Sequence, residues 1–421
     1  MPVSAITPEQ KLAQTILENQ DLDLVLQKAK GILKTGFNAG DGYGAIFIRD
    51  LNTFVELGIE VHSYEVLSDR LANFFIFQSG DNHIQDVYYY PKMTTDPDPY
   101  DPNQMGRATV ETDQETSLVQ AICKLVHTTG NRSILDKMIK GISVLERMDL
   151  ALEYLLKYKW SKEYGLIWGA TTMDWGDVQP EAGVNCTQYR PGISHRSIDI
   201  YDNAMFVIAI EQYLPFIEQD TKRHSKWAKI KKELKQNIRK HLWDEQHQKF
   251  IPHLYLETSP FPKNFDENQI VYHGGTAVAI KADLLSSNEI TISLKKMRDN
   301  IKASGCATIG LTCWPCYPDG YFHSAGMNKS FVYQNGGDWT WFGGRMVREL
   351  IRNGFVEEAY QEMLPMVKRV IDNRGFYEWY DEHNKPSSSG TFRGSAGVLG
   401  MAIKEIQKWA KSHCQMRDSL R

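Results

Sequence analysis

The chain has 421 residues, long enough for one large closed fold or for two or three domains of average size. Its formal net charge is only -4, which argues against nucleic acid or an anionic membrane as a partner. No apolar run reaches the roughly 18 residues that a membrane-spanning helix needs. The amino terminus shows no signal peptide, so we expect a cytoplasmic protein.

Helical periodicity dominates the chain. In the first half we expect two short opening helices before Gly36, one or two helices over 50–77, a long polar loop over 81–109, and helices over 113–127 and 131–157. In the second half we expect a long aromatic loop over 164–194, helices over 198–214 and 221–242, a short hairpin strand over 250–255, and helices over 276–285, 290–301, 344–352, 356–370 and 393–409.

Nearly all-apolar helices alternate with amphipathic ones along the chain, as 198–214 and 221–242 illustrate. A helix that is apolar all round is buried, whereas an amphipathic helix covers the outside. About a dozen helices in alternating inner and outer roles predict an all-α fold, an (α/α)6 barrel with its long loops on one face. We expect a single catalytic domain over 1–421. An α-solenoid is the rival fold, but its repeats would be more alike and its loops shorter.

The stretch 333–345 combines glycines, aromatic rings and an Asp/Arg pair. Gly336 and Gly337 allow the backbone to approach a ligand closely. Trp339 and Trp341 offer flat apolar faces with one N–H group each. The stretch therefore predicts the wall of a site for a polar, ring-shaped ligand, and the alternative is a buried turn that is rich in aromatic residues.

Two carboxyl groups stand out beside aromatic residues. Asp174 lies between Met173 and Trp175, where apolar neighbours would raise its pKa and suit a general acid, with Asp177 as the competing candidate. Glu378 also has aromatic neighbours and is a candidate for activating water. Two carboxyl groups on opposite faces of a sugar are the minimum equipment for glycoside hydrolysis.

Three further polar groups have two interpretations each. Arg49 and Asp50 are suited to binding sugar hydroxyls, although Asp50 would also make a good N-cap. The acids over 111–115 are typical of a capping box, which we favour over ligand contact. The polar residues over 195–203, Asp202 among them, open an apolar helix and are candidates for facing the barrel centre.

The sequence contains no HExxH motif, phosphate-binding loop, dinucleotide fingerprint or GxSxG motif. We therefore expect no metal and no cofactor. Cys313 and Cys316 have the spacing of a redox or zinc motif, but no second pair follows, so we expect free thiols.

Four segments in chain order resemble the six-hairpin glycosidases, a group that includes neutral/alkaline invertases, trehalases, processing α-glucosidases and the glucosidase part of glycogen-debranching enzymes. The segments are 45–50 (AIFIRD), 172–174 with 198–201 (TMD and IDIY), 317–337 (YPDGY and YQNGG) and 376–381 with 394–396 (FYEWYD and GSA). The resemblance implies an (α/α)6 barrel that cleaves an α-linked glycoside with inversion.

Carried over residue by residue, the resemblance makes Asp174 the acid and Glu378 the base. Arg49 and Asp50 would hold the sugar at the point of cleavage, and the loops 81–109 and 164–194 would close over it. The other expected substrate contacts are Trp175, Asp177, Asp202, Gln334, Asn335, Gly337, Trp339, Trp341 and Tyr380. The chain departs from the invertases because Trp-Gly-Asp, and not a basic pair, follows Asp174, which argues against sucrose as the substrate.

We expect a small carbohydrate or oligosaccharide as the binding partner, and the oligomeric state is not predicted. One alternative is a sugar 2-epimerase on the same barrel, with His195, His273 and His323 as acid/base candidates. A second is a carbohydrate-binding protein without catalysis. Within the hydrolases, small α-glycosides such as glucosylglycerate or mannosylglycerate are the rival substrates.

Overall fold

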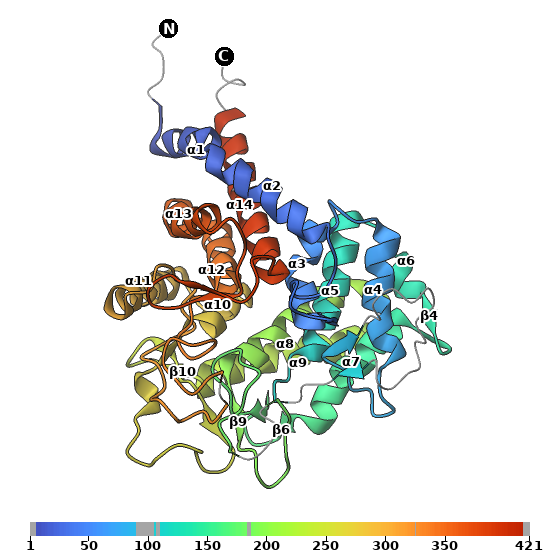
Figure 1. Cartoon of the computed structure of the whole chain (residues 1–421). Coiled ribbons are helices and arrows are strands. Elements are labelled where there is room, and N and C mark those ends of the chain that lie inside the picture. The colour runs from blue at the N-terminus through green and yellow to red at the C-terminus, as the bar shows by residue number, and fades with distance from the viewer. Residues whose placement is uncertain (1–5, 90–104, 107–109, 183–186, 325, 416–421) are drawn as a thin grey trace.

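The computed structural model describes residues 6–89, 105–106, 110–182, 187–324 and 326–415, and these residues contain fourteen α-helices (Figure 1). Six of the described helices pack against one another in a closed ring. In order around the ring they are α3 (Ile48–Gly58), α5 (Gln114–Thr129), α8 (Ile200–Tyr213), α10 (His273–Lys281), α12 (Thr340–Arg352) and α14 (Arg393–Gln415).

Each inner helix packs against at least one of six outer helices in the described residues. The outer helices are α2 (Gln20–Leu33), α4 (Tyr64–Ile76), α7 (Val144–Tyr158), α9 (Thr221–His241), α11 (Ser287–Ser304) and α13 (Val356–Asp372). Helix α8 is buried along nearly its whole length, whereas its partner α9 buries only Trp227, Leu234 and Ile238. The predicted (α/α)6 barrel is therefore confirmed, while the single domain over 1–421 stays a prediction.

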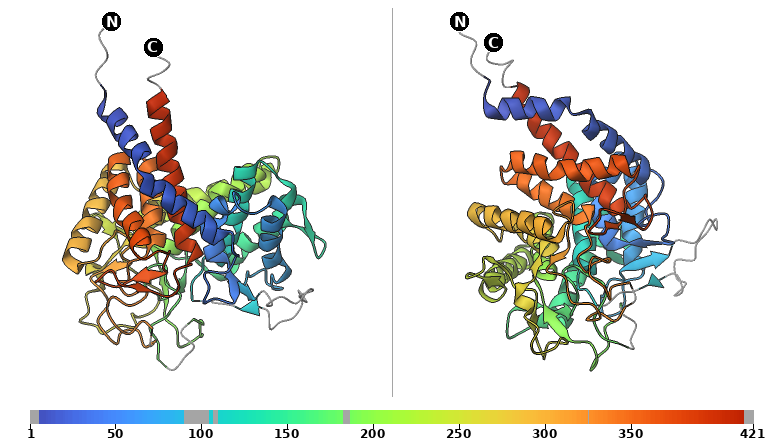
Figure 2. Two further views of the ribbon diagram at one scale, coloured as in Figure 1. Left: turned by 45° about the horizontal axis from the view of Figure 1, so that its top comes forward. Right: turned by 60° about the vertical axis from the view of Figure 1, so that its left-hand side comes forward.

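The first helix, α1 (Pro8–Glu18), packs against α14, so the two ends of the described chain lie side by side. Figure 2 shows the long connections gathered on the opposite side of the molecule. They carry short antiparallel pairs and three-stranded sheets. The strands are β1 (Ala45–Phe47), β2 (Val87–Tyr89), β3 (Met105–Gly106), β6 (Trp160–Ser161), β7 (Leu166–Ile167), β8 (Gly169–Ala170), β9 (Arg196–Ile198), β10 (Trp243–Asp244), β11 (Lys249–Phe250), β12 (Leu254–Tyr255), β13 (Val271–Tyr272), β14 (Cys313–Trp314), β15 (Trp379–Tyr380) and β16 (Pro386–Ser387).

The single helix expected over 131–157 is wrong in its first half. The chain forms α6 (Ser133–Asp136), then a hairpin of β4 (Met138–Ile139) and β5 (Ile142–Ser143), and only then α7. The hairpin turns at Lys140 and Gly141, which both have positive φ, the pattern of a two-residue type I′ turn. Most of the expected loop over 81–109 lies outside the described residues.

Asp338 joins three of the loops beside the barrel. Its carboxylate pairs with Arg369 on α13 at 3.0 Å and accepts a hydrogen bond from the Thr308 backbone N–H. Its own backbone exchanges two hydrogen bonds with Tyr380. Because Asp338 and Arg369 are both fully buried, this ion pair fixes the loop that leads into α12 beside the strand that follows Glu378.

Replacing Asp338 by Ala should therefore lower the free energy of unfolding by about 3–5 kcal/mol, because Arg369 would remain as a buried and unpaired charge. Asp372→Ala is the matched control, since it breaks the exposed Lys368–Asp372 pair on the same helix and should cost less than about 1 kcal/mol. Urea unfolding measures both variants. Equal midpoints for the two would contradict this role of Asp338.

Candidate active site

A cavity of about 100 Å³ opens where the inner helices begin. Arg49 and Asp50 come from the first turn of α3, and Trp341 comes from the first turn of α12. Glu111 precedes α5, and Phe392 precedes α14. The lining residues are Ala39, Tyr43, Phe47, Arg49, Asp50, Asp86, Glu111, Trp175, Asp177, Tyr333, Gln334, Trp339, Trp341, Glu378 and Phe392.

The indole and phenyl rings form one interlocked wall. Trp175 packs edge to face on Trp339 and Trp341, at centroid distances of 4.6 and 5.1 Å, and stacks on Phe342 at 4.5 Å. The Nε1 atoms of Trp175 and Trp341 are buried and have no hydrogen-bond partner among the described residues. Such donors suit hydroxyl groups of a bound ligand.

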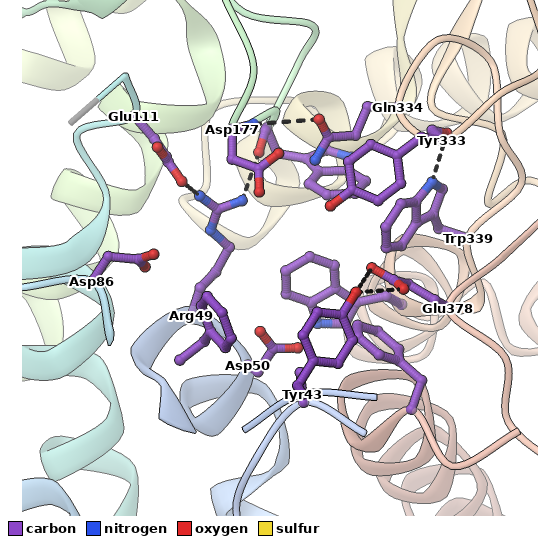
Figure 3. A pocket seen from close by; sticks show the side chains of 15 residues that line it. Tyr43, Arg49, Asp50, Asp86, Glu111, Asp177, Tyr333, Gln334, Trp339 and Glu378 are labelled. Carbon is purple, nitrogen blue, oxygen red and sulfur yellow. Dashed lines mark hydrogen bonds and ion pairs between the residues drawn. The ribbon is translucent and has the colours of Figure 1, made fainter. Parts of the chain in front are cut away.

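Arg49 is held in place by the protein itself. Its guanidinium pairs with Glu111 and, at 3.0 Å, with Asp113, and it donates to the backbone carbonyl of Trp175 at 2.9 Å. Figure 3 shows Arg49 reaching Glu111 at one side of the cavity. The guanidinium thus ties α3, the segment before α5 and the loop around Trp175 together.

The interpretations of Asp50 as an N-cap and of the acids over 111–115 as a capping box are both wrong. The N-cap of α3 is Phe47, so Asp50 lies inside the helix and its Oδ1 has no partner among the described residues. No capping box forms at α5, because the carboxylates of Glu111 and Asp113 pair with Arg49 and the Asp113 side chain caps nothing. A buried guanidinium needs carboxylate partners more than a helix end needs a cap.

Asp50 has an unusual protonation state. Burial, the largest cause, and the charges of Glu378, Asp86 and Asp177 together raise its pKa to about 8, in spite of the neighbouring Arg49. At neutral pH this carboxyl group therefore carries its proton in most molecules, and it can both donate to and accept from a sugar hydroxyl.

Glu378 lies just before β15 and reaches the cavity opposite Arg49 (Figure 3). The Tyr43 hydroxyl lies 2.8 and 2.7 Å from its two carboxylate oxygens and donates to them. Burial raises the pKa of Glu378, the hydrogen bond from Tyr43 opposes this effect, and the charge of Asp177 adds to it. Glu378 is thus a desolvated carboxylate that faces a ligand-sized space.

Asp174 and Asp177 lie in one loop but have different surroundings. Asp174 does not line the cavity; its two carboxylate oxygens each accept a backbone N–H at 2.7 Å, from Gly274 and Gly275 at the start of α10. Helix α10 has no side-chain cap from its own N-cap residue, Tyr272, so Asp174 satisfies these N–H groups from outside.

Asp177 lines the cavity instead. Its backbone N–H donates to the Gln334 side chain at 3.3 Å, and its buried Oδ1 has no hydrogen-bond partner among the described residues. In Figure 3 the Asp177 carboxyl group points into the space between Arg49 and Glu378. This placement favours Asp177, the alternative that the sequence left open, over Asp174 as the cavity acid.

The cavity gathers Arg49, Asp50, Trp175, Asp177, Gln334, Trp339, Trp341 and Glu378 from the residues that the sequence singled out. Asp174, Asp202, Asn335, Gly337 and Tyr380 do not line it. Asn335 binds the backbone of Tyr317, and a Cβ atom at Gly337 would lie 2.0 Å from the Tyr333 carbonyl oxygen, so both shape the loop.

Sequence reasoning missed Ala39, Tyr43, Phe47, Asp86 and Phe392 as lining residues, included Tyr333 only as part of the predicted wall over 333–345, and assigned Glu111 to a cap. Tyr43 and Phe47 lie shortly before the Arg49–Asp50 pair in the sequence, and this proximity could have indicated that they line the same site. Asp86 carried no signal, because a single acid in a polar loop is ordinary.

No histidine lines the cavity among the described residues. His195 pairs with Glu181, and His323 is exposed. His273 is buried between Asn300 and the Ile309 carbonyl, and burial lowers its pKa to about 4. The epimerase alternative therefore has no acid/base histidine at this cavity.

Comparison with known proteins agrees with this fold and cavity. The family model described as amylo-alpha-1,6-glucosidase matches residues 97–411. No curated protein sequence gives a match. Within the described residues, no helix combines the length and apolar character needed to cross a membrane.

Solved structures with the same fold are distant in sequence. A GH63 mannosylglycerate hydrolase from Thermus thermophilus in complex with glucose is 11% identical, with a TM-score of 0.63 over 90% of this chain and 99% of that one. The same hydrolase in complex with Tris is 12% identical, with a TM-score of 0.65 over 90% of this chain and 99% of that one. A rhamnosidase from Klebsiella oxytoca with rhamnose bound is 10% identical, with a TM-score of 0.60 over 92% of this chain and 64% of that one.

The barrel, with a carboxylate-lined cavity at the start of its inner helices, is that of a six-hairpin glycosidase, and the protein is a glycoside hydrolase. The chain belongs to the amylo-alpha-1,6-glucosidase family, whose model covers well over half of it.

The two aspartates should respond differently to the same substitution. Asp174→Asn should lower the free energy of unfolding by about 1–3 kcal/mol, because the amide NH2 group cannot accept a backbone N–H and leaves one glycine unsatisfied. Asp177→Asn, the matched variant three residues away, should leave stability unchanged because the Oδ1 of Asp177 has no partner to lose. Thermal unfolding of both variants checks this, and equal loss in both would contradict the anchoring role of Asp174.

Proposed function

We propose that the protein hydrolyses an α-linked glucoside in a single displacement, with Asp177 as the acid and Glu378 as the base. The observation that carries the proposal is that these two carboxyl groups, from loops two hundred residues apart, face one aromatic-walled cavity. Asp177 would protonate the leaving oxygen while Glu378 takes a proton from the attacking water, and the sugar inverts at its anomeric carbon.

The other lining residues have matching roles in this proposal. The protonated Asp50 and the indole N–H groups of Trp175 and Trp341 would bind sugar hydroxyls. Tyr43 would orient the Glu378 carboxylate toward the water. Arg49 would act as a positioning residue, because its hydrogen bonds go to the protein. The structurally similar hydrolase that binds glucose supports a small sugar as the ligand.

The charges around the cavity favour a neutral leaving group. Five carboxyl groups line it, from Asp50, Asp86, Glu111, Asp177 and Glu378. The guanidinium of Arg49 is the sole cationic group in the described lining, and it is already paired. A glycerate carboxylate would face like charges there, which costs affinity. We therefore favour neutral α-glucosides over the glycerate-linked glycosides. A glucosylglycerate that is cleaved faster than methyl α-glucoside would overturn this preference.

The acid assignment predicts a dependence on the leaving group. Asp177→Asn should lower kcat for an alkyl α-glucoside by about 10²–10⁴-fold, since proton donation is worth that much. The same variant should hydrolyse α-glucosyl fluoride nearly as fast as the wild type, because fluoride leaves without a proton.

Asp50→Asn is the control for the acid assignment. Its amide retains a donor and an acceptor in place of the protonated carboxyl group, so any loss should be similar for both substrates. If the selective rescue by fluoride belonged to Asp50→Asn or Asp174→Asn and not to Asp177→Asn, the acid would be misassigned. A failure of every α-glucoside to react with the wild type would remove the proposed function itself.

The base assignment predicts a pH effect. Glu378 must be deprotonated to act, so its pKa sets the acidic limb of the profile of kcat/KM against pH. The Tyr43 hydroxyl stabilises the charged form and so lowers this pKa. Tyr43→Phe should therefore move the acidic limb to higher pH. An unchanged limb, or one that moves to lower pH, would contradict the assignment of Glu378 as the base.

A further inference from the structure

A second cavity lies inside the barrel, further along the inner helices than the sugar cavity. It holds about 30 Å³, and its cationic side chains come from α5, α10 and α12: Lys124, Lys281, Arg345 and Arg348. A larger cavity of about 570 Å³ adjoins it and shares Lys124 and Lys281 as lining residues. We call the place where the two cavities share these lysines the cationic junction.

Some charges at the cationic junction are already paired. The Arg348 guanidinium pairs with Glu56 and Glu405, at 2.9 and 2.7 Å. Lys124 donates to the backbone and side-chain oxygens of Asn52, at 2.6 and 2.8 Å. Arg352, which lines the larger cavity, pairs with Glu349 at 2.7 Å.

Two cations form no salt bridge with the described residues. Lys281 makes no hydrogen bond or ion pair with any described residue, although it lines both cavities. The Arg345 guanidinium likewise has no carboxylate partner among the described residues and stacks on the rings of Trp341 and Phe342, at 5.1 and 4.6 Å. Six cationic side chains line the two cavities, because Arg132 joins the five named above, and only Glu56, Glu349 and Glu405 of the described residues oppose them, so positive charge is in excess.

Mutual repulsion adds to the cost of this arrangement. Burial, the largest cause, and the charges of Arg352 and Arg348 lower the pKa of Lys281 to about 8, and the carboxylates of Glu349 and Glu56 oppose this shift. Burial also lowers the pKa of Lys124, with Lys281 as the next cause. The positive groups are thus close enough to destabilise each other's charge, which an anion between them would relieve.

Neutralising a helix end is the simpler explanation for a cation in the last turn of an inner helix, because the terminal carbonyl groups carry partial negative charge. Lys124 lies outside the last turn of α5 and donates to the Asn52 carbonyl oxygen within α3, so it does not neutralise a helix end. Lys281 lies in the last turn of α10 but donates to no carbonyl oxygen of the described residues. Lys281 lines both cavities instead.

We propose that the cationic junction binds a small oxyanion of the phosphate class, with Lys281 and Arg345 as its main cationic contacts. The smaller cavity has room for only a few water-sized groups. A phosphate group fits there with its oxygens toward the cations, and the larger cavity leaves space for an ester substituent. The ligand is therefore inorganic phosphate or a small phosphate monoester. This proposal does not rest on the proposed hydrolysis.

Calorimetric titration with inorganic phosphate and, separately, with glycerol 2-phosphate tests the proposal at constant ionic strength. The wild type should bind one anion per chain, and Lys281→Gln should weaken that binding at least about tenfold. Lys232→Gln, which removes an exposed lysine on α9, should bind like the wild type. The anion that binds more tightly identifies the source of the phosphate group.

A labelling experiment needs no variant. A buried lysine with a pKa of about 8 reacts readily with acetic anhydride once it is reached, and phosphate should protect Lys281 but not Lys232, as peptide mass spectrometry would show. The proposal is overturned if neither anion binds saturably up to about 10 mM, if Lys281→Gln binds as tightly as the wild type, or if phosphate gives Lys281 no protection.

Discussion

The burial of carboxylates at the starts of the inner helices is the constraint on which the sugar cavity depends. The beginning of each helix leaves backbone N–H groups without a partner inside the helix. Asp174 binds two such groups at Gly274 and Gly275, and thereby fixes the loop that carries Asp177 into the cavity. Asp174 therefore anchors this loop on α10, whereas the buried Oδ1 of Asp177 has no hydrogen-bond partner among the described residues.

A second buried charge does the same for the opposite side of the cavity. Asp338 pairs with Arg369 and exchanges backbone hydrogen bonds with Tyr380, two residues after Glu378. The aromatic wall that follows Asp338 and the Glu378 loop are therefore held in register by one fully buried ion pair. Reacting groups must be held in a defined geometry, and a buried ion pair of this kind helps to hold the loops that carry them.

The sequence was enough to predict the barrel and most of the cavity. Alternation between apolar and amphipathic helices identifies inner and outer layers because burial itself sets that pattern. The sequence could not show which of Asp174 and Asp177 lines the cavity, because both lie in one loop. Asp174 has a positive φ of 50°, which local propensity does not reveal. Tyr43 could not be identified because its role arises from its hydrogen bond to Glu378, which is distant in sequence.

The stereochemistry of the product tests the central claim most directly. If Asp177 and Glu378 act on opposite faces of an α-glucoside in one displacement, the first product observed by ¹H NMR should be β-glucose, which then mutarotates slowly. The anomeric proton signals in the first minutes of reaction distinguish the two anomers. Initial release of α-glucose would contradict the single displacement and, with it, the role of Glu378 as a base that activates water.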